Sequence, residues 1–377
     1  MIFLSSTDML PDPRPYLQRI PDPRRETKNK LHPLGDIIMI VLCSVLSGIE
    51  DWVGMEIFAE EKEAWFRQFL ALPNGIPSHD TLSDVMSRLE PGLFVSVVLE
   101  WVKTALPHLS GEQICLDGKA SRGSRDGSRC AIHLVGAYAA KARLFLAQSA
   151  VKEKSNEIHA IPEVLAQLDL TGALVTIDAM GCQKEIARQI IEGQADYALA
   201  LKSNHRALYE EVTLWLDAEA GHGRLLVHET VDKDHGRLEI RRAVLSDQLD
   251  WLPHKAQWPG LQAVGRLEST RIVGDKSSTE YRYYLLSFND LERFQSAARH
   301  HWSIENSLHW VLDVQFSEDA NRSRKAHSAH NLAMIRRMSL NILRSNGKPK
   351  DSLRIRKIRA SANDTYREEL IFGGKVT

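Results

Sequence analysis

The middle of the chain limits the fold most, because its apolar residues occur in a distinctive series of short runs. Three strand-like runs follow one another at residues 113–119, 130–140 and 144–151. The second run contains no Asp, Glu, Lys or Arg, which is expected of a central strand buried on both faces. These runs predict a sheet whose first three strands are consecutive along the chain.

Helices and strands alternate after these three runs. The spacing of apolar residues predicts helices at residues 157–168, 183–192 and 205–216, with strands between them at 174–177 and 197–201. Three meandering strands followed by such alternation give a mixed sheet with helices on its faces. The predicted fold class is therefore α/β, with the element order of ribonuclease H-like domains.

Other patterns flank this α/β core. Residues 1–35 are punctuated by proline, which predicts an extended arm, and residues 36–106 have apolar positions at helical spacing. Strands of alternating polarity at 221–288 predict a β-rich insertion, after which helices resume. We therefore expect a helical N-terminal domain with its proline-rich arm at residues 1–106. The core is expected in two parts, at 107–220 and 289–347, with the β-rich insertion between them at 221–288. A basic C-terminal tail is expected at 348–377.

Within the N-terminal domain, a capping sequence at residues 78–81 opens a short amphipathic helix. The alternatives for this helix are a helix-turn-helix recognition element and a packing helix. The second is favoured because Arg88 is the single base on its exposed side.

Charge is distributed unevenly along the chain. The total is −1, from 48 basic and 49 acidic residues, which excludes a uniformly basic nucleic-acid-binding surface. However, residues 36–100 (the acidic segment) hold 3 basic and 11 acidic side chains, whereas residues 322–359 (the basic segment) hold 12 and 1. This asymmetry favours a partner with a phosphate backbone, and solvated helix faces are the alternative.

The cysteines and the apolar stretches indicate a cytoplasmic protein. Cys43, Cys115, Cys130 and Cys182 are widely spaced and fit neither a disulfide framework nor a paired zinc site. The longest apolar stretch, residues 37–46, is too short to span a bilayer. We therefore expect a reducing compartment and no membrane partner.

Two aspartates stand where a sheet can hold a metal ion. Period-two alternation places Asp117 inside an apolar strand, on the same face as Lys119. Asp178 directly follows the strand at 174–177, at the edge where open sheets place ligands. Either aspartate alone more often caps a turn, but two on neighbouring strands need compensating charge. Mg²⁺ prefers a few carboxylates with water and phosphate oxygens, so the pair predicts a magnesium site.

A third acid is expected from a helix that can approach the sheet edge. Residues 299–310 place Glu305 between His301 and His309 at four-residue spacing. A zinc site is the rival interpretation, but ligands spread over eight residues of a straight helix do not converge on one ion. A solvated polar face is the other alternative.

Several motifs in order resemble those of the DDE transposases of bacterial insertion sequences, in particular the H-repeat-associated branch. They are Leu116-Asp-Gly-Lys119, Lys154-Ser-Asn-Glu157, Thr176-Ile-Asp-Ala-Met-Gly-Cys-Gln-Lys184, His235-Gly-Arg-Leu-Glu-Ile-Arg241 and His301-Trp-Ser-Ile-Glu-Asn-Ser-Leu-His-Trp-Val-Leu-Asp313. The N-terminal sequences Ile20-Pro-Asp-Pro-Arg24 and Leu72-Pro-Asn-Gly-Ile-Pro-Ser-His-Asp-Thr81 resemble the helical domain associated with that branch. The similarity therefore runs nearly end to end.

This resemblance implies a ribonuclease H-like catalytic core in which Asp117, Asp178 and Glu305 form an acidic triad and bind Mg²⁺, or alternatively Mn²⁺. It implies DNA as the partner, both the inverted repeats of the element and the target, and a homodimer assembled on that DNA. The glycine-containing loop after Lys119 lacks the Gly-Lys-Ser/Thr of a phosphate-binding loop, so no nucleotide cofactor is expected.

Basic, aromatic and polar residues near the acids are expected to bind DNA. Related transposases have tyrosine, arginine and lysine where this chain has Ala298, His301 and Leu312, so His301 and His309 are expected to take over phosphate contacts. The expected DNA-binding residues are Lys119, Arg122, Lys202, His301, Trp302, Asn306, His309, Arg322, Arg324, Lys325, Arg336 and Arg337.

The expected activity is metal-dependent cleavage of phosphodiester bonds at insertion-sequence ends, followed by transfer of the free 3′-OH strand into target DNA. One alternative is a domesticated or inactive derivative that binds DNA without mobilising it. The other is a metal-dependent nuclease on the same fold.

Overall fold

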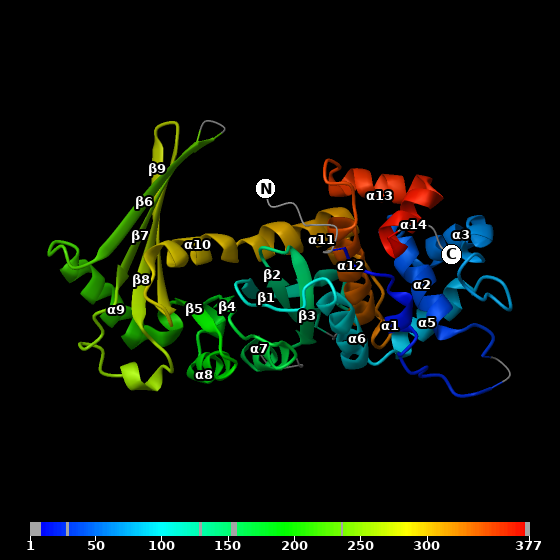
Figure 1. The fold of residues 1–377 in the computed structure, drawn as a ribbon, viewed down its shortest axis with the longest axis horizontal. Helices are drawn as coiled ribbons and strands as arrows, with labels where there is room; N and C mark the ends of the chain where they lie inside the picture. The colour runs from blue at the N-terminus through cyan, green and yellow to red at the C-terminus, as the bar shows by residue number, and fades with distance from the viewer. Residues whose placement is uncertain (1–8, 28–29, 128–129, 152–156, 235–236, 374–377) are drawn as a thin grey trace.

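The computed structural model describes residues 9–27, 30–127, 130–151, 157–234 and 237–373. Residues 154–156 and 235–236 of the motifs quoted above lie outside this part of the chain. Figure 1 shows an elongated molecule, with the insertion strands at one end, the N-terminal helices at the other and the core sheet between them. Within the described ranges, no helix is long and apolar enough to cross a membrane.

All the strands in these ranges form one mixed sheet with the order β3-β2-β1-β4-β5-β9-β8-β7-β6. Strand β1 is antiparallel to β2 but parallel to β4, which is parallel to β5. The predicted α/β class and mixed sheet are therefore confirmed. The strands are β1 Gln113–Ser121, β2 Ile132–Ala139, β3 Leu144–Ala150, β4 Leu174–Ile177, β5 Asp196–Leu201, β6 Leu226–Asp234, β7 Arg237–Ser246, β8 Ala263–Val273 and β9 Lys276–Leu286.

The insertion strands β6 to β9 continue the core sheet, because β9 pairs with β5. Alternating polarity in the insertion predicts strands at residues 225–229, 238–244 and 280–286, and it misses β8. In β8 the apolar alternation is interrupted by Gly265, Arg266 and Glu268. The glycine is needed there because a Cβ would lie 2.7 Å from the ring of Phe294 on the helix that covers the sheet.

Helices cover both faces of the sheet (Figure 1). Helices α7, Glu157–Leu165, and α8, Lys184–Glu192, lie on one face. The opposite face is covered by α10, Leu291–His301, which continues through a π-helical turn, Ile304–His309, into α11, Trp310–Phe316. Helix α9, Arg206–Glu219, packs against β9.

The N-terminal helices pack around α12, Ser328–Ser345, which contacts α2, α5 and α6 as well as β3. Ser78 caps α5, with its Oγ accepting a hydrogen bond from the Thr81 N–H at 3.3 Å. The contacts of α5 with α2, α3 and α12 favour a packing helix over a recognition helix. The N-terminal helices are α1 Arg14–Leu17, α2 Leu34–Leu46, α3 Trp52–Glu61, α4 Glu63–Phe66, α5 His79–Arg88 and α6 Pro91–Lys103.

The C-terminal segment differs from the expected tail, because it contains two helices, α13 Leu353–Ala362 and α14 Asp364–Phe372. These helices bind the N-terminal domain through Trp65, whose Nε1 donates to Glu368 Oε1 at 2.8 Å. The Arg367 guanidinium also lies 4.0 Å from the Trp65 ring. The two ends of the described chain therefore form one helical assembly (Figure 1).

Candidate active site

Asp117 and Asp178 are brought together by the pairing of β1 with β4. Leu116 lies opposite Ile177 in this parallel pair, so the two aspartates follow at the same level of the sheet. Burial is the largest influence on Asp117 and, with nearby carboxylates, raises its pKa to about 7. Asp178 accepts a hydrogen bond from the Met180 N–H at 3.1 Å, and burial raises its pKa.

Glu305 lies in the π-helical turn between α10 and α11. In this turn Ile304 and Leu308 are buried against the core, while Glu305 is exposed. Such turns are rare and frequently occur at functional sites. The carboxylates of Asp117, Asp178 and Glu305 line one cavity of about 510 Å³.

The two histidines that flank Glu305 are turned toward the sheet. His309 Nδ1 lies 3.5 Å from Asp117 Oδ2, and burial lowers the pKa of His309 to about 3. His301 Nδ1 lies 3.1 Å from Thr176 Oγ1, and burial lowers the pKa of His301 to about 4. Both imidazoles are therefore neutral at pH 7, and the expected phosphate contacts of His301 and His309 stay a prediction.

The donor set at this cavity suits a hard divalent cation. The carboxylates are oxygen donors, they are partly desolvated, and their mutual repulsion raises the pKa of Asp117. Within the described ranges, no three His, Cys, Asp or Glu side chains are already placed to hold an ion together. A cation bound between Asp117, Asp178 and Glu305 would relieve that repulsion.

The sequence of this chain matches the models of two protein families. Residues 108–342 match the family model of the transposase DDE domain, and residues 15–102 match a DDE_Tnp_1-associated domain. The chain belongs to the DDE transposase family. Its core therefore has the ribonuclease H-like fold of DDE domains, and its helical N-terminal domain is the one associated with them.

Relatives of this DDE transposase chain cover most of its length. The H repeat-associated putative transposase YhhI of Escherichia coli K12 is 37% identical over 361 residues, 93% of this chain and 94% of the relative. The putative transposase YncI of Escherichia coli O157:H7 is 37% identical over 367 residues, 94% and 93% of the two chains. An uncharacterized protein of Xanthobacter autotrophicus, from the dhlA 3′ region, is 46% identical over 290 residues, 76% and 98% of the two chains. The predicted H-repeat-associated branch is therefore confirmed.

Two arginines expected to bind DNA are buried inside this transposase. Arg337 is 3% exposed and its Nη1 lies 2.6 Å from Glu318 Oε1. Arg336 is 1% exposed and its Nε lies 3.3 Å from Glu50 Oε2. The prediction that they contact DNA is wrong, because helical spacing places both on faces of α12 that pack against neighbouring elements.

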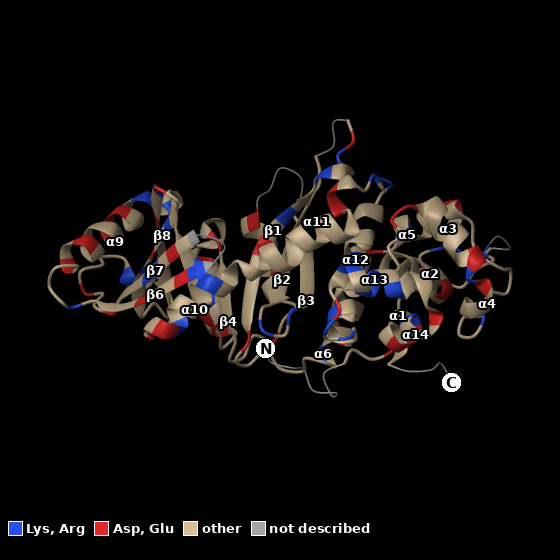
Figure 2. Ribbon diagram, turned by 90° about the horizontal axis from the view of Figure 1, so that it is seen from above, with Lys and Arg blue, Asp and Glu red and all other residues tan. Residues whose placement is uncertain are grey.

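Part of the basic segment is neutralised by carboxylates of the same chain. Lys325 Nζ lies 2.6 Å from Asp84 Oδ1, and Lys357 Nζ lies 3.6 Å from Glu50 Oε1. Figure 2 shows Lys and Arg on α12 and α13 next to the N-terminal helices, which carry Asp and Glu. Contacts between the acidic and the basic segment therefore account for part of the charge asymmetry of the sequence.

Lys119 is also buried, at 8% exposure. Its Nζ lies 2.6 Å from Asp313 Oδ1 and 3.6 Å from Asp319 Oδ1, so it ties β1 to α11 and to the turn that follows. The prediction of a DNA contact for Lys119 is wrong, because its ammonium group is buried and paired with carboxylates of the same chain.

Other predicted contact residues are accessible. Lys202 and Trp302 line the cavity of the three acids. Arg122, Arg322 and Arg324 are exposed, and Arg324 Nε donates to the Gly123 carbonyl at 3.1 Å, which brings the two loops that carry these arginines together. We call Arg122, Arg322 and Arg324 the basic loop cluster.

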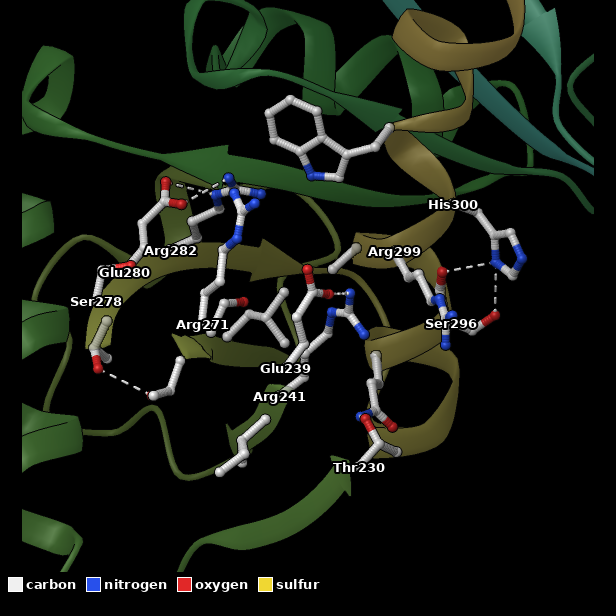
Figure 3. A pocket seen from close by; sticks show the side chains of 18 of the residues that line it. Thr230, Glu239, Arg241, Arg271, Ser278, Glu280, Arg282, Ser296, Arg299 and His300 are labelled. Carbon is white, nitrogen blue, oxygen red and sulfur yellow. Dashed lines mark hydrogen bonds and ion pairs between the residues drawn. The ribbon is translucent and has the colours of Figure 1, made fainter. Parts of the chain in front are cut away.

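A second cavity, of about 810 Å³, lies between the insertion strands and α10 (Figure 3). Sequence reasoning missed most of its arginines because they alternate with acids on strands. Arg282 and Trp302 line both cavities, and the Arg282 guanidinium lies 4.3 Å from the Trp302 ring. The residues that line the second cavity include Arg241, Arg271, Arg282, Arg299, Trp302 and Asn306.

Proposed function

We propose that this chain is a DDE-type DNA transposase that cuts phosphodiester bonds at the ends of an insertion sequence and joins the resulting 3′-OH to target DNA. The observation that carries the proposal is the single cavity lined by Asp117, Asp178 and Glu305, which come from three elements distant in sequence. Membership of the DDE transposase family supports the same assignment.

In this proposal Asp117, Asp178 and Glu305 hold divalent cations, with Mg²⁺ as the physiological ion and Mn²⁺ as a substitute. When bound, such cations lower the pKa of an attacking water and stabilise negative charge on the phosphate. Lys202, at the same cavity, neutralises a phosphate of the DNA strand to be cut. The exposed ring of Trp302 offers a stacking surface for an unpaired base.

DNA beyond the cavity is proposed to follow two basic surfaces. One is the basic loop cluster, and the other is the arginine-lined cavity of the insertion (Figure 3). Two ends must be held together for transposition, so we propose a homodimer on DNA. Action on a bacterial chromosome places the protein in the cytoplasm.

The test is cleavage of labelled DNA that carries the inverted repeats of the element, with purified full-length protein and Mg²⁺. Wild type is expected to nick at the repeat ends, whereas Asp117→Ala and Glu305→Gln are expected to lose cleavage by at least about a hundredfold. Glu305→Gln should still bind the ends in a gel-shift assay. Equal cleavage by wild type and both variants would refute the proposal.

The alternative function is an inactive DNA-binding derivative. It is favoured by one relative, the inactive transposase YbfQ of Escherichia coli K12, which is 40% identical over 73 residues. A match of that length cannot extend from Asp117 to Glu305, so it does not contain the whole triad of this chain. End binding without any cleavage by wild type would select this alternative.

A further inference from the structure

A fourth carboxylate lies against the strand that carries Asp117, outside the lining of the cavity of the three acids. Glu157 is the first residue of α7, and its side chain is 12% exposed. Its Oε1 lies 2.7 Å from Nε2 of His133, a residue of β2. Strand β2 is the neighbour of β1, and His133 pairs in register with Ala120, three residues after Asp117. The ion pair therefore holds the start of α7 over the catalytic strand.

Gly118 makes this approach possible. A Cβ at residue 118 would overlap the Glu157 carboxylate and would lie 2.5 Å from His133 Nε2. The backbone at Gly118 has no positive φ, so conformational freedom does not explain the glycine. The space above β1, directly after Asp117, is instead occupied by the carboxylate of Glu157.

The charge of Glu157 acts on both aspartates. After burial, Glu157 is the strongest influence that raises the pKa of Asp178, and it also raises the pKa of Asp117. In the structure, Glu157 reaches the strand position next to Asp117, and His133 holds its carboxylate there. The position is explained if a cation is shared by all of them.

We propose that Glu157, oriented by His133, is a fourth acidic residue of the catalytic centre and helps to hold its divalent cations. This inference rests on the proposed function, because it assumes the metal site of Asp117, Asp178 and Glu305. His133 is a positioning residue in this scheme, since its imidazole contacts the carboxylate and not the cation.

The experiment measures Mn²⁺ binding to the full-length protein by titration calorimetry in the absence of DNA. Glu157→Gln is expected to weaken Mn²⁺ binding about tenfold or more, and Asp117→Asn at least as much. Glu163→Gln is the matched control, because Glu163 lies on the same helix but faces Ser149, and it should bind like wild type. The melting temperature of each variant without metal reports folding.

Gly118→Ala provides a second variant that changes no charge. Its methyl group should displace Glu157 and weaken Mn²⁺ binding about tenfold in the wild-type background, but have little further effect in a Glu157→Ala background. If Glu157→Gln and Gly118→Ala bind Mn²⁺ like wild type while Asp117→Asn does not, this inference is wrong and the proposed function stands. If Asp117→Asn also binds like wild type, the metal site itself is wrong.

Discussion

At the scale of single residues, burial separates the arginines that stabilise the fold from those that can reach DNA. Arg337 and Glu318 are both almost completely buried and form an ion pair. Replacing Arg337 by methionine leaves the Glu318 charge without this partner, so we expect the free energy of unfolding to fall by about 3–5 kcal/mol. Urea denaturation measures this change.

The double variant Arg337→Met/Glu318→Leu is the control, because it removes both charges. It should recover most of the lost stability. DNA affinity, corrected for the folded fraction, should be unchanged in both variants. A loss of DNA affinity with unchanged stability would instead indicate that Arg337 contacts DNA.

In contrast to Arg337, the exposed arginines of the basic loop cluster should affect DNA affinity rather than stability. Arg322→Ala removes a charge that can neutralise one phosphate, so we expect weaker binding to any DNA sequence and a salt dependence of log K that is shallower by about 1. Fluorescence anisotropy at several salt concentrations gives this slope. Arg19→Ala, which removes an exposed arginine of the N-terminal domain, should leave the slope unchanged.

At the scale of elements, the catalytic face of β1 is fixed to the helix that carries Glu305. Lys119 lies two residues after Asp117 and binds Asp313, eight residues after Glu305. Lys119→Met should therefore loosen this contact, cost about 1–3 kcal/mol of stability and slow cleavage more than tenfold while end binding persists.

Lys119→Arg keeps the charge and should restore part of the cleavage rate, which a loss of packing alone would not predict. Single-turnover cleavage and gel shifts on the same preparations distinguish the two effects. A Lys119→Met variant that is fully folded and cleaves like wild type would exclude a positioning role.

The elements also show how far the sequence could predict this site. The mixed sheet, the placement of Asp178 after β4 and the approach of Glu305 follow from apolar spacing and from the resemblance. The π-helical turn does not, because the apolar residues Ile304, Leu308 and Val311 fit an ordinary helix equally well. Likewise, the motif Lys154-Ser-Asn-Glu157 gives Glu157 no role, because the approach of this residue to β1 depends on Gly118 and on pairing between β1 and β2.

At the scale of the whole molecule, the first and last parts of the chain depend on each other. Deleting residues 348–377 removes α13 and α14, and with them the hydrogen bond of Trp65 and the ion pair of Lys62 with Asp364. Large aromatic residues of the N-terminal domain would then be exposed to water. We expect a melting temperature lower by at least about 5 °C, measured by calorimetry.

A chain that ends at residue 373 keeps both helices and should melt like the full chain. If the deletion of residues 348–377 were neutral, the C-terminal helices would be an independent appendage. The sequence pattern predicts a separate basic tail at residues 348–377. It does so because a charge count along the chain does not show which charges pair after folding.

The join between β5 and β9 has a consequence for how DNA is handled. Because β9 pairs with β5, the described parts of the insertion and the core share one hydrogen-bonded sheet, which restricts rotation of one relative to the other. The shared sheet therefore limits how far the arginines of the insertion can move relative to Asp117, Asp178 and Glu305. If DNA binds both surfaces as proposed, the position of the cut should depend on length along the strand as well as on sequence.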